Sequence, residues 1–363
     1  MSAGHAAPAT SLELPGPFTL ESGASLPSVT VAFRTWGRRD EDGGNAVLVC
    51  HALTGSADVD RWWGDLLGPG RALDPGRDFV VCSNVLGSCY GTTGPTSPHP
   101  GGPGRWGGDF PAITVRDIVR VQAALLDALG VRHLRLVVGG SLGGMQVLEW
   151  ALLFPERVDA IAPIAVSARH SAWCIGLSEA QRQAIYADPR WQGGHYPAGD
   201  GPEAGLAVAR QIAMCTYRSH ASLEARFSRN AGESGVFAVE GWLRHHGRAL
   251  VDRFDANTYV ALTRAMDTHD VGRGRGGWRE ALSSVRVPAL VVSIDTDLLY
   301  PPVEQQELAA ALPAARLVTL SSPHGHDAFL IEGEATNALL SGFRAAIERG
   351  SQGNGREEGT WVA

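Results

Sequence analysis

Residues 134–158 constrain the fold of this 363-residue chain more than any other segment. They consist of an apolar β-type run, a Gly-Gly-Ser-Leu-Gly-Gly turn and an apolar stretch with helical character. Residues 139–143 fit Gly-x-Ser-x-Gly, a sharp strand-to-helix turn that can expose a nucleophilic serine. We expect a Cβ at Gly139 or Gly143 to collide with neighbouring backbone, and Ser141 to take a strained conformation. The start of the helix would offer free N–H groups to an oxyanion.

The motif alone does not establish catalysis, because a serine in such a turn can merely cap the helix. A catalytic role for Ser141 requires an acid after a later strand and then a histidine near the C-terminus. The apolar run 287–294 predicts a buried parallel strand, and it leads into Asp295 and Asp297. The next strand-like segment is followed by His324 and His326. The order Ser, Asp, His is the one expected of the α/β-hydrolase fold.

The alternation of strands and helices predicts one α/β-hydrolase core with a mostly parallel central sheet, formed by residues 13–167 and 284–349. Residues 168–283 contain helical patterns but no convincing buried strand. This pattern predicts an inserted helical lid above the carboxyl edge of the sheet, where ligands bind in open α/β sheets. Residues 1–12 and 350–363 lack apolar periodicity and are expected to be disordered tails.

Charge and cysteine usage narrow the class of protein. The chain has 31 basic and 38 acidic residues, a net charge of −7, and no basic cluster, which argues against nucleic acid as a partner. Its apolar runs are too short for a membrane span, and no signal segment is evident. Five scattered cysteines without C-x-x-C favour free thiols in a reducing cytosol, so we expect a cytoplasmic protein. No metal-ligand spacing or dinucleotide-binding signature is evident, so we expect no metal and no bound cofactor.

The candidate residues suggest a division of roles. Ser141 needs a base within hydrogen-bond reach. We favour His326 over His324, because Gly325 permits a close turn, whereas His324 follows a proline and fits a role in supporting the loop. Asp297 lies farther beyond the strand than Asp295, in a position to orient the imidazole.

An oxyanion hole needs two N–H donors. One is expected from Leu142, directly after the nucleophile, and the other from the loop after the first buried strand, where Leu53 is the most plausible donor. His51 begins that loop and is expected to hold its shape rather than to act chemically.

Several segments together resemble the homoserine O-acetyltransferase family, which are α/β-hydrolase-fold enzymes of methionine biosynthesis. The resemblance extends from about residue 18 to residue 343, and its matching blocks are residues 51–55, 68–70, 83–95, 139–146, 254–257 and 325–330. One departure is Leu142, where the family pattern usually has Met. This change conserves volume and leaves the backbone donor intact.

The resemblance implies a triad of Ser141, Asp297 and His326, and it selects Asp297 over Asp295. It also implies that Arg210 binds the carboxylate of an amino-acid substrate and that Asp327 binds its ammonium group. Such a substrate needs a planar cationic fork and an anion to replace its hydration. Without the resemblance, Arg210 would be interpreted as an ordinary arginine on a helix surface.

The family mechanism is ping-pong. It implies acetyl transfer from acetyl-CoA, as a co-substrate, through acetyl-Ser141 to the hydroxyl of L-homoserine, in a homodimer that pairs through lid helices. The alternatives are a homoserine O-succinyltransferase, a serine O-acetyltransferase and, less favoured, an esterase-type hydrolase. Serine lacks one methylene, a difference worth only about 1–3 kcal/mol. We expect acetyl rather than succinyl, because no additional lid arginine presents itself for a second carboxylate.

Overall fold

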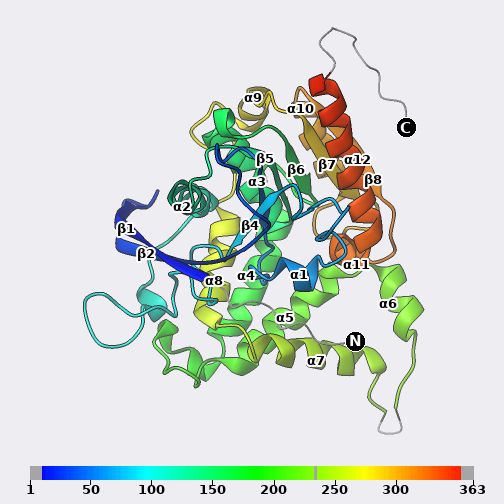
Figure 1. Ribbon diagram of the computed structural model, residues 1–363. Coiled ribbons are helices and arrows are strands. Elements are labelled where there is room, and N and C mark those ends of the chain that lie inside the picture. Colours follow the sequence, from blue (N-terminus) through cyan, green and yellow to red (C-terminus); the bar gives the residue numbers. More distant parts are fainter. Residues whose placement is uncertain (1–9, 233–234, 353–363) are drawn as a thin grey trace.

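The computed structural model describes residues 10–232 and 235–352. Within these ranges the central element is an eight-stranded sheet with the order β1-β2-β4-β3-β5-β6-β7-β8 (Figure 1). β1 (Thr10–Thr19) and β2 (Ser25–Trp36) are antiparallel to each other, and β2 is antiparallel to β4 (Phe79–Ser83). The other pairs are parallel, which confirms the predicted sheet. Their strands are β3 (Ala46–Cys50), β5 (Leu134–Gly140), β6 (Ile161–Ile164), β7 (Ala289–Ile294) and β8 (Ala315–Leu320).

Side chains of the central strands alternate between two apolar layers, because successive residues of a strand face opposite sides of the sheet. In β3, Ala46, Leu48 and Cys50 belong to one cluster, whereas Val47 and Val49 belong to the other. Helices α2, α3 and α10 contribute to the first layer, and α1, α11 and α12 to the second. Their bounds are α1 (Val59–Trp62), α2 (Val115–Ala128), α3 (Leu142–Leu153), α10 (Pro302–Ala311), α11 (Ala328–Ile331) and α12 (Gly333–Gln352).

A helical insertion separates β6 from β7. It comprises α4 (Ala172–Tyr186), α5 (Glu203–Tyr217), α6 (His220–Phe227), α7 (Ala238–Val251), α8 (Ala256–Asp267) and α9 (Trp278–Ser283). Arg169, just before the insertion, forms an isolated antiparallel bridge with Asp270, which lies between α8 and α9. Figure 1 shows α4, α5 and α7 gathered at one end of the sheet. The helical insertion predicted between the two parts of the core therefore corresponds to this segment of the chain.

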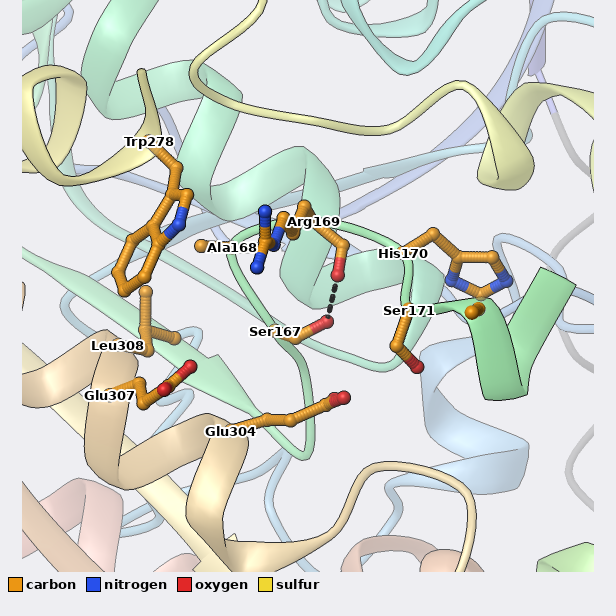
Figure 2. Close-up of a pocket in the computed structure, with 10 residues that line it drawn as sticks. Ser167, Ala168, Arg169, His170, Ser171, Trp278, Glu304, Glu307 and Leu308 are labelled. Carbon is orange, nitrogen blue, oxygen red and sulfur yellow. Dashed lines mark hydrogen bonds between the residues drawn. The ribbon is translucent and has the colours of Figure 1, made fainter.

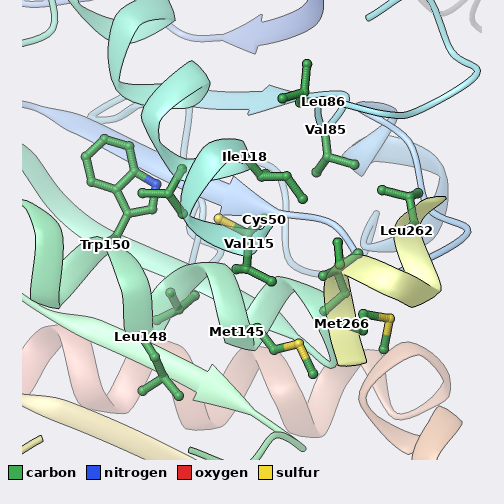
Figure 3. Close-up of a cluster of buried hydrophobic side chains, with 14 of the residues drawn as sticks. Cys50, Val85, Leu86, Val115, Ile118, Met145, Leu148, Trp150, Leu262 and Met266 are labelled. Atoms are coloured by element: carbon green, nitrogen blue, oxygen red, sulfur yellow. The ribbon is translucent and has the colours of Figure 1, made fainter. Parts of the chain in front are cut away.

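The insertion is packed against the core rather than suspended above it. Leu262 and Met266 of α8 belong to the same apolar cluster as Met145 and Trp150 of α3 (Figure 3). α6 and α9 have only 8 and 6 residues, which is too few turns for an apolar period to be recognised in the sequence.

The ends of the chain differ from the predicted tails. β1 begins at Thr10, and Leu12 is paired with Val31 of β2, so residues 10–12 are ordered by strand pairing. α12 continues to Gln352, so the prediction of disorder was also wrong for residues 350–352. The rest of the two predicted tails, residues 1–9 and 353–363, lies outside the described residues.

Two further expectations concern the whole molecule. All five cysteines are free thiols, as their spacing predicts. Among the helices of residues 10–232 and 235–352, none has the length and apolar character needed to cross a bilayer.

Candidate active site

The nucleophile turn has the strained geometry that its sequence predicts. Ser141 lies between β5 and α3 with φ 58° and ψ −125°, a conformation that L-residues other than glycine rarely adopt. A Cβ at Gly139 would lie 2.5 Å from the carbonyl oxygen of Cys50, and one at Gly143 would lie 2.1 Å from the same atom. The N–H of Ser141 donates to the carbonyl of Ile164 at 3.0 Å, which ties the turn to β6. Glycine is therefore required on both sides of the serine.

The structure joins His326 to Asp297. Their Nδ1 and Oδ2 atoms are 2.7 Å apart, and each residue is only 3% exposed. The other carboxylate oxygen of Asp297 accepts hydrogen bonds from the N–H groups of Leu299 and Tyr300, at 2.8 and 2.9 Å. Because the carboxylate holds the proton on Nδ1, Nε2 is left as the basic atom. Burial lowers the pKa of His326, but the charge and hydrogen bond of Asp297 outweigh this effect, and the pKa is raised.

Aromatic rings enclose His326 and connect it to the serine turn. The ring centroids of Tyr217, Tyr300 and Phe329 lie 5.7, 5.3 and 5.7 Å from that of the imidazole. A Cβ at Gly140, the residue before Ser141, would lie 2.6 Å from the Phe329 ring, so the same ring borders both partners. No hydrogen bond joins the Ser141 hydroxyl to His326 among the described residues. Such contacts are often long in the free enzyme and tighten when substrate binds.

The alternative acid and base have other roles. Asp295 accepts hydrogen bonds from the Ser321 hydroxyl at 2.6 Å and from the Ser322 N–H at 3.0 Å, so it holds the loop that precedes the histidines. The Nδ1 atom of His324 lies 3.1 Å from the Ser222 hydroxyl on α6. His324 therefore supports the loop, as its sequence position indicates.

The two expected oxyanion donors lie at the carboxyl ends of neighbouring strands. Leu142 is the first residue of α3, so its N–H has no carbonyl partner within the helix, and Leu53 lies in the loop after β3. His51 fixes that loop: its Nδ1 is 2.8 Å from the carbonyl of Ala52, and its Nε2 accepts the N–H of Val85 at 3.2 Å. Burial lowers the pKa of His51 to about 4, so the ring is neutral, as this pair of bonds requires. The structural role expected for His51 agrees with these contacts.

A cavity of about 700 Å³ adjoins this region. Gly140 and Ala52 are part of its wall, and they directly precede Ser141 and Leu53 in the chain. The apolar part of the wall includes Trp62, Phe329 and Leu330, and the charged residues of the wall are Asp58, Arg61, Arg210 and Arg253.

The two residues expected to bind an amino acid lie near His326. Arg210 on α5 lines the cavity, and its guanidinium lies 5.2 Å from the ring centroid of Tyr217. Asp327 follows His326 and forms an ion pair with Arg218 at 3.3 Å. Burial raises the pKa of Asp327, although the charges of Arg218 and Arg210 oppose this shift. Arg218 was missed by the sequence analysis, because nothing in its local sequence separates it from a surface arginine.

A second cavity, of about 380 Å³, lies between the loop after β6 and helix α10 (Figure 2). Its wall includes Ser167, Arg169, Trp278 and Glu304, and contains none of the predicted site residues. The described residues contain no cluster of His, Cys, Asp and Glu side chains that could hold a metal ion. The serine turn, the His–Asp pair and the first cavity together make up the candidate site.

Comparison with known sequences agrees with this geometry. A family model described as the alpha/beta hydrolase fold matches residues 45–332. A homoserine O-acetyltransferase from Trichormus variabilis is 60% identical over 335 residues, which cover 92% of this chain and 93% of the relative. A homoserine O-acetyltransferase from Salinibacter ruber is 56% identical, with 91% and 96% coverage.

Solved structures share the same architecture. The structure of a homoserine O-acetyltransferase from Bacillus anthracis aligns with a TM-score of 0.86 at 25% identity, covering 93% of this chain and 97% of that one. Esterase E22 aligns with a TM-score of 0.85 at 27% identity, covering 93% and 100%. The backbone thus resembles both transferases and esterases, whereas the much higher sequence identities are with transferases. This chain is a member of the homoserine O-acetyltransferase family, built on the α/β-hydrolase fold.

Proposed function

We propose that this protein transfers an acetyl group from acetyl-CoA to the side-chain hydroxyl of L-homoserine, as a step of methionine biosynthesis. The observation that carries the proposal is the buried His326–Asp297 pair beside the strained turn of Ser141. The substrates follow from the similarity to curated homoserine O-acetyltransferases over nearly the whole chain.

In the first half-reaction, Nε2 of His326 takes the proton of the Ser141 hydroxyl as Oγ attacks the thioester carbonyl. The N–H groups of Leu142 and Leu53 stabilise the resulting oxyanion. When the tetrahedral intermediate collapses, the C–S bond breaks and the departing thiolate of CoA receives the proton from His326. The products are free CoA and acetyl-Ser141.

In the second half-reaction, the homoserine hydroxyl attacks acetyl-Ser141 while His326 takes its proton. The intermediate then expels the serine oxygen, which receives that proton. Arg210 binds the carboxylate of homoserine, and Asp327 binds its ammonium group. Arg218 keeps Asp327 in place next to His326 by their ion pair. The rings around His326 limit access of water, which would otherwise hydrolyse the intermediate.

Hydrolysis of acetyl esters is the second candidate function, favoured by the likeness to esterase E22. Release of free CoA from acetyl-CoA, measured with and without L-homoserine, distinguishes the two. We expect rapid release only with homoserine, and release at equal rates would favour the hydrolase. Ser141→Ala should abolish both reactions while leaving the circular dichroism spectrum unchanged; an active Ser141→Ala enzyme would refute covalent catalysis.

The choice of acyl donor needs its own test. The expectation of acetyl rather than succinyl transfer rested on the absence of an additional lid arginine, but Arg253, which follows α7 in the lid, lines the cavity. That premise was wrong, and the preference for acetyl rests on the names of the relatives. Turnover should be compared with acetyl-CoA and succinyl-CoA at equal concentration, and with L-serine in place of L-homoserine. Faster succinyl transfer, or faster transfer to serine, would replace the proposed substrate.

A homodimer that pairs through lid helices is part of the same proposal. Its support is a set of exposed apolar side chains on two lid helices, namely Trp173 (54% exposed) and Ile175 (38%) on α4 and Val208 (45%) on α5. Light scattering on the intact protein should give twice the mass of the chain, and Val208→Glu should shift it towards the monomer. A monomeric wild-type protein would contradict this assembly.

A further inference from the structure

The cavity beside the serine turn carries more positive charge than an amino-acid substrate requires. Three of its wall residues, Arg61, Arg210 and Arg253, are cations, and Asp58 is the acidic one. Asp58 is already paired with Arg34 at 2.9 Å, and the Arg34 side chain is only 6% exposed. The proposed role of Arg210 accounts for one carboxylate, so two cations are left without a ligand.

Arg253 is fixed in place at the cavity wall. It follows α7 in the lid, and its NH1 donates to the carbonyl of Thr54 at 2.8 Å and to the hydroxyl of Tyr90. Both partners belong to the core and line the same cavity. Both bonds use the same nitrogen, NH1, of an exposed guanidinium that carries five N–H donors. The N–H groups on the other two nitrogens are therefore available to bind an anion.

Arg61 lies on the core side of the cavity, on the short helix α1. Figure 1 shows α1 between the sheet and the lid helices. The Arg61 side chain is exposed and makes no hydrogen bond or ion pair with the described residues. The neighbouring indole of Trp62 also lines the cavity and is held by a hydrogen bond from its Nε1 to the carbonyl of Ser56 at 3.0 Å. The two arginines therefore belong to opposite parts of the fold and line one cavity.

We infer that Arg61 and Arg253 bind the phosphate groups of the CoA thioester, an inference that rests on the proposed function. An uncharged ester would make no use of two additional cations, and homoserine carries a single carboxylate. A CoA thioester is a polyanion, and the chain itself has a net charge of −7, so a local excess of positive charge is needed to hold this donor. Guanidinium groups suit phosphate because they donate paired hydrogen bonds.

The same cavity also reaches the positions that the two ends of such a donor would occupy. Gly140 borders the nucleophile, whereas Arg61 and Arg253 supply charge elsewhere on the same wall. The volume of about 700 Å³ falls in the range of ligand sites and suits the pantetheine arm between thioester and phosphates. The acyl group would lie at Ser141 while the phosphates remain at the arginines.

The test compares acetyl-CoA with S-acetylpantetheine, which has the same thioester but no phosphate. For Arg61→Met, kcat/KM with acetyl-CoA should fall about tenfold, and for Arg61→Met/Arg253→Met about a hundredfold, mostly through KM. With S-acetylpantetheine the same variants should match the wild type within about threefold. The readout is the ratio of kcat/KM with acetyl-CoA to kcat/KM with S-acetylpantetheine, because general damage to the fold would lower both values alike. Arg248→Met, an exposed arginine of α7 outside the cavity, is the matched control and should leave the ratio unchanged.

Each outcome has a distinct meaning. Wild-type protein that does not turn over acetyl-CoA would contradict the proposed function itself. Active wild-type protein with an unchanged donor ratio in both variants would overturn the inference alone. A third arm uses succinyl-CoA: if Arg253→Met slowed succinyl transfer but left the acetyl-CoA ratio intact, Arg253 would bind an acyl carboxylate, and the phosphate assignment would be wrong.

Discussion

Replacement of Asp297 by asparagine removes both the negative charge and the hydrogen-bond acceptor that the buried acid offers to His326. The carbonyl oxygen of the new amide side chain can still accept the N–H groups of Leu299 and Tyr300, so the turn after β7 should keep its shape. The amide nitrogen would then face Nδ1 of His326, where the carboxylate now lies at 2.7 Å. An amide that donates to Nδ1 moves the ring proton to Nε2, and the imidazole can then no longer accept the serine proton.

The size of the effect follows from the charges involved. The imidazolium that forms during attack lies beside a carboxylate whose side chain is fully buried. Two unit charges about 4 Å apart attract each other by ~4 kcal/mol at an effective dielectric constant of about 20. Because 1.36 kcal/mol is about a factor of ten in rate, the variant should lose roughly a thousandfold in kcat/KM.

The assay is CoA release with saturating L-homoserine, together with thermal unfolding to show that the variant is folded. Asp295→Asn is the matched control, because Asp295 lies two residues away but binds Ser321 and Ser322 instead of the imidazole. We expect the control to retain activity within about tenfold of the wild type. A folded Asp297→Asn enzyme with activity close to that of the wild type would show that the Asp297–His326 pair is structural.

The remaining predictions concern pH and packing. Because His326 must be neutral to act as a base and its pKa is raised above the ordinary 6.5, kcat/KM should fall about tenfold per pH unit below that pKa; a profile that is flat from pH 8 to pH 6 would contradict this role. Burial lowers the pKa values of His51, His170 and His269 to about 4, 3 and 3, so the unfolded state takes up their protons first as the pH falls through 6.5. Each of these three histidines should then lower the free energy of unfolding by ~1.4 kcal/mol per pH unit. His326, whose pKa is raised, has the opposite effect. The urea midpoint of unfolding should therefore be lower at pH 5 than at pH 7.5, and an equal or higher midpoint would refute the reasoning. Gly143→Ala should destabilise the fold by at least ~2 kcal/mol, since its Cβ would lie 2.1 Å from a backbone oxygen, whereas Gly176→Ala on α4, with open space around it, should not; equal melting temperatures for the two would argue against the close turn.

Features encoded by neighbouring residues were predictable from the sequence. The turn at Ser141 follows from glycines within two positions of it. The capping box at the start of α2 is likewise local, since Thr114 and Asp117 exchange hydrogen bonds. That an acid and a histidine meet near the serine was predictable for another reason: parallel strands bring their carboxyl ends to one edge, whatever their separation along the chain. The choice of Asp297 over Asp295 came from the family resemblance.

Contacts between the lid and the core were not predictable in the same way. Arg253 donates to a carbonyl 199 residues away, and Arg218 meets Asp327 across the same boundary. An arginine near the end of a helix has the same local sequence whether it faces solvent or a cavity. The lid packs by side-chain shape, without the regular pairing that fixes strands, so the sequence pattern gives no register for it.

The Phe329 ring touches both halves of the proposed machinery, since it packs beside His326 and would contact a Cβ at Gly140. Its backbone carbonyl also accepts the indole N–H of Trp63, 266 residues earlier in the chain. During synthesis on the ribosome, the serine emerges long before this segment does. A growing chain therefore contains Ser141 long before His326, and the two residues can come together only when the last part of the core has docked.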